Sequence, residues 1–149
     1  MSDEAGGPYV QVAAVCERVL NEKDGVLSLI RIVDRFVVPV PTPAPGAETP
    51  AVTINAFLVV ALKSGFYEGK GTLRIVPTSP SGKQQPELSS GILLEGQDRG
   101  MNVVLQLQFV TREEGLHWFD VFFENQLLTR IPVRVLFSWM AGVPKVEPQ

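Results

Sequence analysis

The chain has 149 residues, of which 45% are hydrophobic and 19% charged, and it contains one cysteine and one histidine. This length suggests one domain with a core large enough to fold without disulfides or metal, and the single cysteine and histidine exclude a disulfide framework and the usual zinc motifs. A net charge of −3 argues against nucleic acid as a partner, because nucleic-acid-binding domains usually carry a basic face.

The acidic, small-residue N-terminus does not have the basic start and apolar run of a secretory signal. No stretch approaches the roughly 20 apolar residues that cross a bilayer. A cytoplasmic protein with no membrane association is therefore expected, and a lone cysteine agrees with a reducing compartment.

The first segments predict a β-hairpin behind a flexible arm over residues 1–8. Four valines between positions 10 and 19 favour a strand over residues 9–20, although several good helix formers there also allow a short helix. Asp24 and Gly25 can supply the positive φ angles of a tight turn, so this strand should pair antiparallel with a strand over residues 26–37.

Residues 39–50 contain five prolines. Proline has no N–H to donate, so this segment is not expected to join a ladder. An interdomain linker is one interpretation, but the 38 preceding residues are too few for an independent core. The preferred interpretation is a long, exposed loop that crosses between two sheets.

The rest of the chain alternates apolar and polar residues with period two, as half-buried strands require. The run from Val103 to Phe109 is the clearest example. Strands are predicted near residues 52–62, 72–76, 92–95, 101–110, 116–123 and 128–137, separated by turns. The sequence therefore predicts an all-β, two-sheet antiparallel β-sandwich of about eight strands over residues 9–139, followed by a flexible tail over residues 140–149.

Several of these runs resemble a family of small uncharacterised bacterial proteins. The segment from Gly25 to Asp34 has the form Gly-x-Leu-Ser-Leu-x-x-x-x-Asp of the second strand in that family, which follows an N-terminal strand and a polar glycine turn. The similarity continues through residues 57–62, 71–77, 115–121 and 131–135. The resemblance implies an immunoglobulin-like β-sandwich and no particular activity, because this kind of fold hosts many functions.

No catalytic constellation is recognisable. His117 is the only imidazole, and Cys16 and Asp34 are possible partners by residue type alone. His117 is expected to be a partly exposed packing residue and Cys16 a small buried one. The protein is therefore predicted not to be an enzyme.

No cofactor or metal site is expected either. The glycines at 65–71 lack the Gly-Lys-Ser/Thr ending of a phosphate loop, and the acidic residues Asp98, Glu113 and Glu114 lack the spacing of a calcium loop. The charged residues of the first predicted hairpin are interpreted as cross-strand ion pairs on a solvated face: Glu17, Arg18, Arg31, Asp34 and Arg35.

Phe66 and Tyr67 lie in a predicted glycine-rich turn. Aromatic side chains at a loop tip can stack on a sugar or insert into a partner. They can equally fold back as a lid over the end of the sandwich. The first possibility gives the alternative functional hypothesis, a small-ligand or carbohydrate-binding domain.

The last predicted hairpin gives the leading hypothesis. If Phe119, Val121 and Phe123 face the core, Trp118 and Phe122 must point outward. A turn with an odd number of residues, such as 124–126, would keep the core positions of the two strands opposite one another.

That register places Pro132 opposite Trp118 and Leu128 opposite Phe122. Together with residues further along, the outer face would then carry Trp118, Phe122, Leu128, Pro132, Leu136 and Trp139. Large exposed apolar patches usually mark interaction sites, and a proline in this strand suggests a sheet edge. The predicted function is a non-enzymatic protein-interaction or self-assembling module, with a homodimer or another protein bound on this face, unless the N-terminal arm or the Pro-rich loop covers it.

Overall fold

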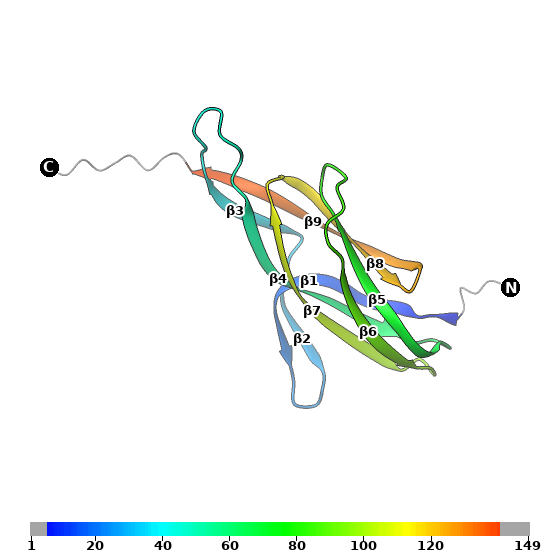
Figure 1. Ribbon diagram of the computed structural model, residues 1–149. Coiled ribbons are helices and arrows are strands. Elements are labelled where there is room, and N and C mark those ends of the chain that lie inside the picture. Colours follow the sequence, from blue (N-terminus) through cyan, green and yellow to red (C-terminus); the bar gives the residue numbers. More distant parts are fainter. Residues whose placement is uncertain (1–5, 141–149) are drawn as a thin grey trace.

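The computed structural model describes residues 6–140, which form two β-sheets packed face to face (Figure 1). The strands are β1 (Tyr9–Asn21), β2 (Leu27–Ile32), β3 (Arg35–Pro41), β4 (Val52–Lys63), β5 (Glu68–Thr78), β6 (Leu88–Glu95), β7 (Gly100–Thr111), β8 (Gly115–Phe123) and β9 (Gln126–Met140). One sheet has the order β2-β1-β4-β7 and the other β3-β9-β8-β5-β6. The predicted all-β, two-sheet sandwich is confirmed, with nine strands in place of about eight.

The extra strand arises because the predicted strand over residues 26–37 divides in two. The chain leaves the four-stranded sheet after β2 and enters the five-stranded sheet at β3, which runs parallel to β9. Arg31 has a φ of 58°, in the left-handed region, just before this change of sheet. Apolar residues occur on both sides of the break, at Ile32 and Val33 and again at Phe36 and Val37, so the sequence is readily interpreted as one strand.

The expectation that residues 39–50 stay outside any ladder is wrong at its start. Residues 39–41 belong to β3, where Pro39 pairs with Ser138 and Pro41 with Met140. An edge strand tolerates proline where the missing N–H would have pointed away from its neighbour, and the two prolines are two residues apart, so both nitrogens face the same side. The following segment does connect the five-stranded sheet to the four-stranded one, as predicted.

Residues 9–20 form a strand, which settles the choice between strand and helix, and β1 pairs antiparallel with β2 as predicted. A register shift between Val10 and Val12 interrupts the pairing of β1 with β4. The second half of β1 and all of β2 project from the body of the sandwich (Figure 1). Gly25, with a φ of 83°, lies in the turn at the tip of this hairpin.

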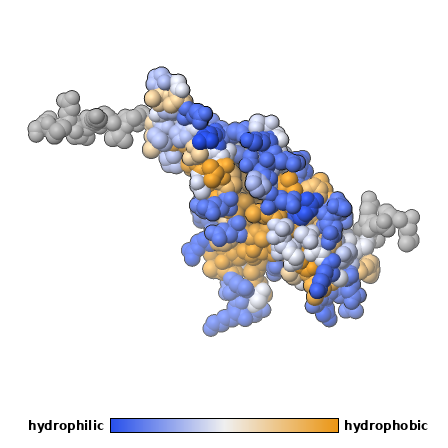
Figure 2. Space-filling model, viewed as in Figure 1, coloured by the Kyte–Doolittle hydropathy of each residue, from blue (hydrophilic) through white to orange (hydrophobic). Residues whose placement is uncertain are grey.

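The core lies between the sheets and is built from alternate residues of the central strands. The largest fully buried side chain is that of Phe119, and leucines and valines from β4, β5, β8 and β9 surround it. A smaller apolar cluster around Val40 and Phe137 fills the β3 end of the sandwich. Hydrophobic residues are also exposed on the surface. Figure 2 shows them as an orange area in its centre, which lies over β1, β4 and β7 as drawn in Figure 1.

Part of the predicted flexible arm belongs to the fold. The carbonyl oxygen of Gly6 accepts a hydrogen bond from the Phe66 N–H at 2.8 Å, and Pro8 is buried. A Cβ on Gly65 would lie 2.7 Å from the same oxygen, so the close approach of the two segments requires glycine there. The predicted tail over residues 140–149 is wrong at its first residue, because Met140 is the last residue of β9. The rest of that tail and residues 1–5 of the arm lie outside the described residues. Between residues 6 and 140 there is no helix of the length and apolarity needed to cross a membrane.

Candidate functional site

The outer face of the five-stranded sheet carries the predicted aromatic residues of β8. Phe119, Val121 and Phe123 point inward and are at most 3% exposed. Trp118 and Phe122 alternate with them on the outer face and are half-buried. The predicted division of β8 into inward and outward side chains is confirmed.

Trp118 is covered by an arginine of the neighbouring strand. The guanidinium carbon of Arg130 lies 4.3 Å from the centre of the Trp118 ring. Arg130 Nε also donates a hydrogen bond to Asp120 Oδ1 at 2.8 Å, and these two residues are register partners on β9 and β8. The carboxylate therefore holds the cation over the indole, in an arrangement that contributes about 0.5–1 kcal/mol when exposed.

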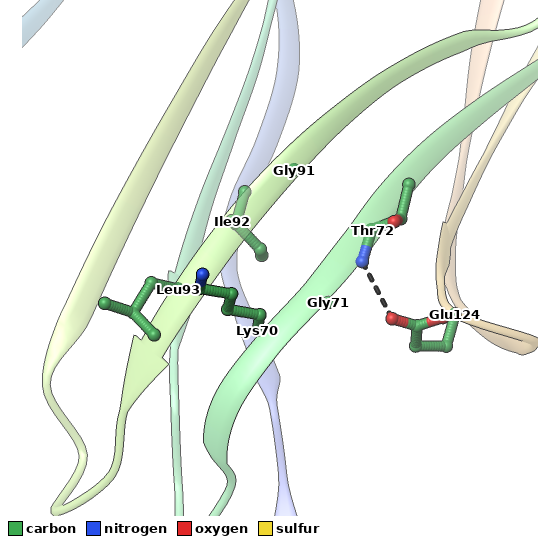
Figure 3. A pocket seen from close by; sticks show the side chains of 7 residues that line it. All are labelled: Lys70, Gly71, Thr72, Gly91, Ile92, Leu93 and Glu124. Carbon is green, nitrogen blue, oxygen red and sulfur yellow. Dashed lines mark hydrogen bonds between the residues drawn. The ribbon is translucent and has the colours of Figure 1, made fainter.

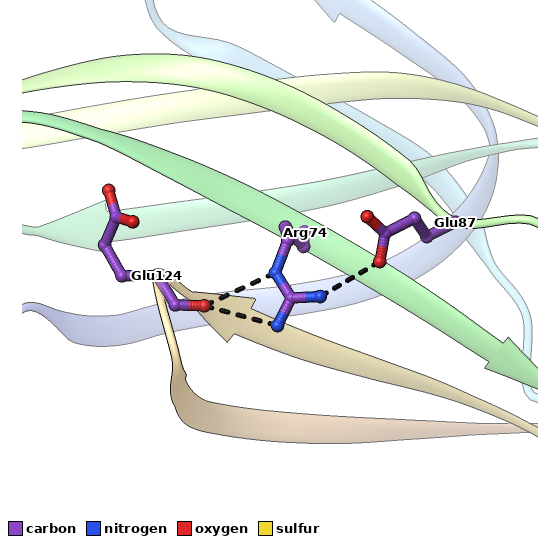
Figure 4. Close-up of polar contacts among 3 residues, drawn as sticks. All are labelled: Arg74, Glu87 and Glu124. Carbon is purple, nitrogen blue, oxygen red and sulfur yellow. Dashed lines mark hydrogen bonds and ion pairs between the residues drawn. The ribbon is translucent and has the colours of Figure 1, made fainter.

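Phe122 is likewise covered by an arginine, Arg74, whose polar contacts are drawn in Figure 4. The guanidinium carbon of Arg74, on β5, lies 5.0 Å from the centre of the Phe122 ring. Arg74 Nη1 is 3.0 Å from Glu87 Oε2, and its Nε and Nη2 donate to the carbonyl oxygen of Glu124 at 3.4 and 3.3 Å. Within the described residues, neither positions 6–8 of the N-terminal arm nor the Pro-rich loop takes part in these contacts, and arginines of the same sheet cover the two rings.

The predicted position of Leu128 on this face is wrong. The turn after β8 has two residues, because Phe123 pairs with Gln126, and a bulge between Val121 and Phe122 restores the core register. Phe122 consequently faces Leu127, which is 47% exposed, while Leu128 packs against the core. The bulge keeps the core residues of β8 and β9 opposite one another, which was expected of a three-residue turn.

Pro132, Leu136 and Trp139 divide between the two faces. Pro132 is exposed on the outer face opposite Trp118, as predicted, and Leu136 is half-buried on the same face. Trp139 lies inside β9, not beyond its end, and its ring contacts that of Phe137 at 5.8 Å. Since Phe137 points into the core, Trp139 is on the inward side at the open end of the sandwich, and its predicted place in the outer patch is wrong.

A shallow depression of about 520 Å³ lies beside the Phe122 contacts (Figure 3). Its lining residues are Lys70, Gly71, Thr72, Gly91, Ile92, Leu93 and Glu124. Thr72 and Gly91 are register partners on the outer face, and no atom lies within 4 Å of a Cβ built on Gly91. The missing side chain therefore makes the hollow.

Glu124 closes one side of this depression. Its Oε1 accepts a hydrogen bond from the Thr72 N–H at 2.9 Å, just where β8 ends and leaves the edge of β5 without a neighbour. Sequence reasoning missed the depression, because the only signal was a pair of glycines in strands whose pairing was not known.

The loop aromatics Phe66 and Tyr67 separate. Phe66 is 80% exposed at the tip of the turn. Tyr67 packs edge-on against Phe123, with ring centres 4.9 Å apart, and its hydroxyl donates to the Lys70 carbonyl oxygen at 3.4 Å. The two rings do not form a joint stacking platform, so the geometry does not support the alternative hypothesis in its original form.

His117 and Cys16 do not form a reactive pair. His117 is 4% exposed, which corrects the expectation of a partly exposed residue, and its Nε2 lies 3.1 Å from the Glu113 carbonyl oxygen. Burial lowers the pKa of His117 and raises the pKa of the Cys16 thiol, so both favour their neutral forms. Cys16 is fully buried, as predicted, and lies in the other sheet.

The remaining predicted features are structural. Arg31 and Glu17 form a cross-strand ion pair at 2.6 Å, as expected for the first hairpin. In the part of the chain that the structure describes, no three His, Cys, Asp or Glu side chains gather in a way that could hold a metal.

No protein-family model and no curated protein matches the chain. Among solved structures, an immunoglobulin-like protein from Pseudomonas aeruginosa aligns at 15% identity with a TM-score of 0.43, over 88% of this chain and 98% of that one. The CARDB domain of a Pyrococcus furiosus protein, in complex with di-metal ions, aligns at 12% identity with a TM-score of 0.40, over 91% and 99%.

β-Glucosidase 3B from Thermotoga neapolitana aligns at 14% identity with a TM-score of 0.46 over 59% of this chain, which covers 15% of that enzyme. All three TM-scores are below 0.5, so these alignments add nothing to the two-sheet β-sandwich that the strand order already shows.

Proposed function

We propose that this β-sandwich is a non-enzymatic interaction module that binds a protein partner on the outer face of its five-stranded sheet. The observation that carries the proposal is the pair of half-buried aromatic side chains, Trp118 and Phe122, each under an arginine and neither buried by another segment of residues 6–140. Tryptophan and arginine are enriched at binding hot spots.

The adjacent depression supports the same proposal. Hot spots concentrate where a side chain of one protein fills a pocket of the other. The hollow above Gly91 begins next to Leu93, which is 51% exposed, and ends at Glu124, so an apolar side chain of a partner would fit beside Phe122.

Charge favours a partner with carboxylates over a second copy on this face. Arg35 and Arg134 are register partners and are both exposed, and no ion pair of either occurs among residues 6–140. Two copies docked face to face would bring Arg35 and Arg134 of both chains into one interface, whereas a partner's Asp or Glu residues would neutralise these two cations.

The test is affinity capture from cells that produce the chain, with three tagged forms compared. Trp118→Ser with Phe122→Ser should lose the captured protein, with a weakening of at least about 30-fold, since each hot-spot side chain contributes about 2 kcal/mol or more. Thr53→Lys with Asn55→Lys alters the outer face of the other sheet and should capture as the unaltered protein does. Equal loss in both variants, or equal retention, would refute the proposal, and circular dichroism checks that each variant is folded.

A further inference from the structure

β7 forms one edge of the four-stranded sheet and has none of the usual edge protection. It pairs with β4 over its whole length, from Lys63 opposite Gly100 to Val52 opposite Thr111, without a register shift. Among residues 6–140, β4 is the one strand hydrogen-bonded to it. Its twelve residues include no charged side chain and no proline. An edge of this kind presents a row of free N–H and C=O groups that can pair with another chain.

The other three edge strands are protected. β2 has six residues and ends beside Arg31, whose left-handed φ and ion pair with Glu17 disrupt any further pairing. β3 carries Pro39 and Pro41, which remove donors from its free side. β6 has eight residues, with a glycine at its centre and a glutamate at its end. β7 is therefore exceptional among the sheet edges of the described chain.

The surface next to the β7 edge is apolar. Val104 is 39% exposed and Val110 is 57% exposed, with the exposed Gln106 and Gln108 between them. This strand lies under the orange area in the centre of Figure 2. A second strand placed here would cover apolar side chains and would meet no like charge.

The sequence of β7 is nearly symmetric about Leu107. Val104 is matched by Val110, Leu105 by Phe109, and Gln106 by Gln108. In an antiparallel pair, directly opposed residues lie on the same face of the sheet. Two copies related by a two-fold axis at Leu107 would thus place valine opposite valine and glutamine opposite glutamine on the outer face, and leucine opposite phenylalanine on the inner face.

We propose that two copies of this chain associate by antiparallel pairing of β7 with β7, which joins two four-stranded sheets into one continuous eight-stranded sheet. The occupant is a second copy because the strand is self-complementary in residue type and charge. This interface lies on the opposite sheet from Trp118 and Phe122, so it leaves the proposed partner face open and does not depend on it.

The test is sedimentation velocity at tens of micromolar. The unaltered protein should sediment with twice the chain mass of 16.3 kDa. Gln106→Lys with Gln108→Lys places lysine opposite lysine twice and should sediment with a single chain's mass. Gln106→Lys with Gln108→Glu places lysine opposite glutamate in both halves, so this variant should remain a dimer whose dissociation increases with salt.

A monomeric unaltered protein, or a dimeric double-lysine variant, overturns the proposal. A Trp118→Ser, Phe122→Ser protein should stay dimeric, and its dissociation would show that the copies meet on the other sheet. Hydrogen exchange of the unaltered protein gives a second measurement that needs no variant. Protection of the β7 amides should rise with protein concentration, and unchanged protection would contradict the pairing.

Discussion

Two glycines of the five-stranded sheet, Gly71 and Gly91, have different structural roles: one allows close packing in the core, and the other leaves a hollow on the surface. A Cβ on Gly71 would lie 2.3 Å from Cζ of Phe123, whereas a Cβ on Gly91 would meet no atom within 4 Å. The first glycine lets the Phe123 ring, and Tyr67 packed against it, lie close to β5. The second opens the depression in the candidate site.

These two positions give a matched pair of substitutions. Gly71→Ala should lower the free energy of unfolding by about 1–3 kcal/mol, because the Phe123 ring must move inside a packed core. Gly91→Ala should leave that free energy within about 0.5 kcal/mol of the unaltered value, as expected at an open surface position. Chemical denaturation measures both, and an equal effect at the two positions would contradict the packing described for Phe123.

At the scale of single elements, alternation along β8 and β9 predicts which side chains share a face of the sheet, but it does not predict which residues pair across the two strands. Period two places Phe119, Val121 and Phe123 together on one face of β8, and their burial in the structure shows that this face is the core. The partner of Phe122 could not be predicted, because a two-residue turn with a bulge and a three-residue turn satisfy the same parity. The choice depends on local backbone geometry, such as the φ of 51° at Glu124, which the hydrophobic pattern does not encode.

β3 allows a direct test of how an edge strand accommodates proline. Pro39 and Pro41 place the nitrogens of odd-numbered residues on the free side, so even-numbered residues donate toward β9. Val37→Pro should therefore leave the melting temperature nearly unchanged. Val38→Pro removes a ladder donor and leaves its β9 acceptor unpaired, which should destabilise the protein by about 1–3 kcal/mol.

Val38 also packs against the smaller core cluster. Val38→Ala separates the cost of lost packing from the cost of the lost hydrogen bond. If the two proline variants melt at the same temperature, the pairing of β3 with β9 described above is incorrect.

At the scale of the whole molecule, the sandwich class and the outward aromatic residues could be read from the sequence, whereas the candidate site needed the topology. Arg74 lies over Phe122 because β5 is the neighbour of β8 in the sheet. In the sequence, 47 residues separate Arg74 from Phe122, and this spacing belongs to no recognisable motif. The change of sheet at Val33 and Asp34 depends equally on long-range pairing. Such contacts follow from how strands are ordered in space, which a single sequence does not specify.

The most direct measurement of the proposed function is a cross-link formed inside cells that produce the protein. A photoreactive phenylalanine analogue at Pro132 would lie on the exposed surface opposite Trp118, and the same analogue at Thr53 would lie on the outer face of the other sheet. We predict a light-dependent adduct between the chain and a different protein from position 132 and none from position 53. An absence of adducts at position 132, or the same adduct from both positions, would contradict the account.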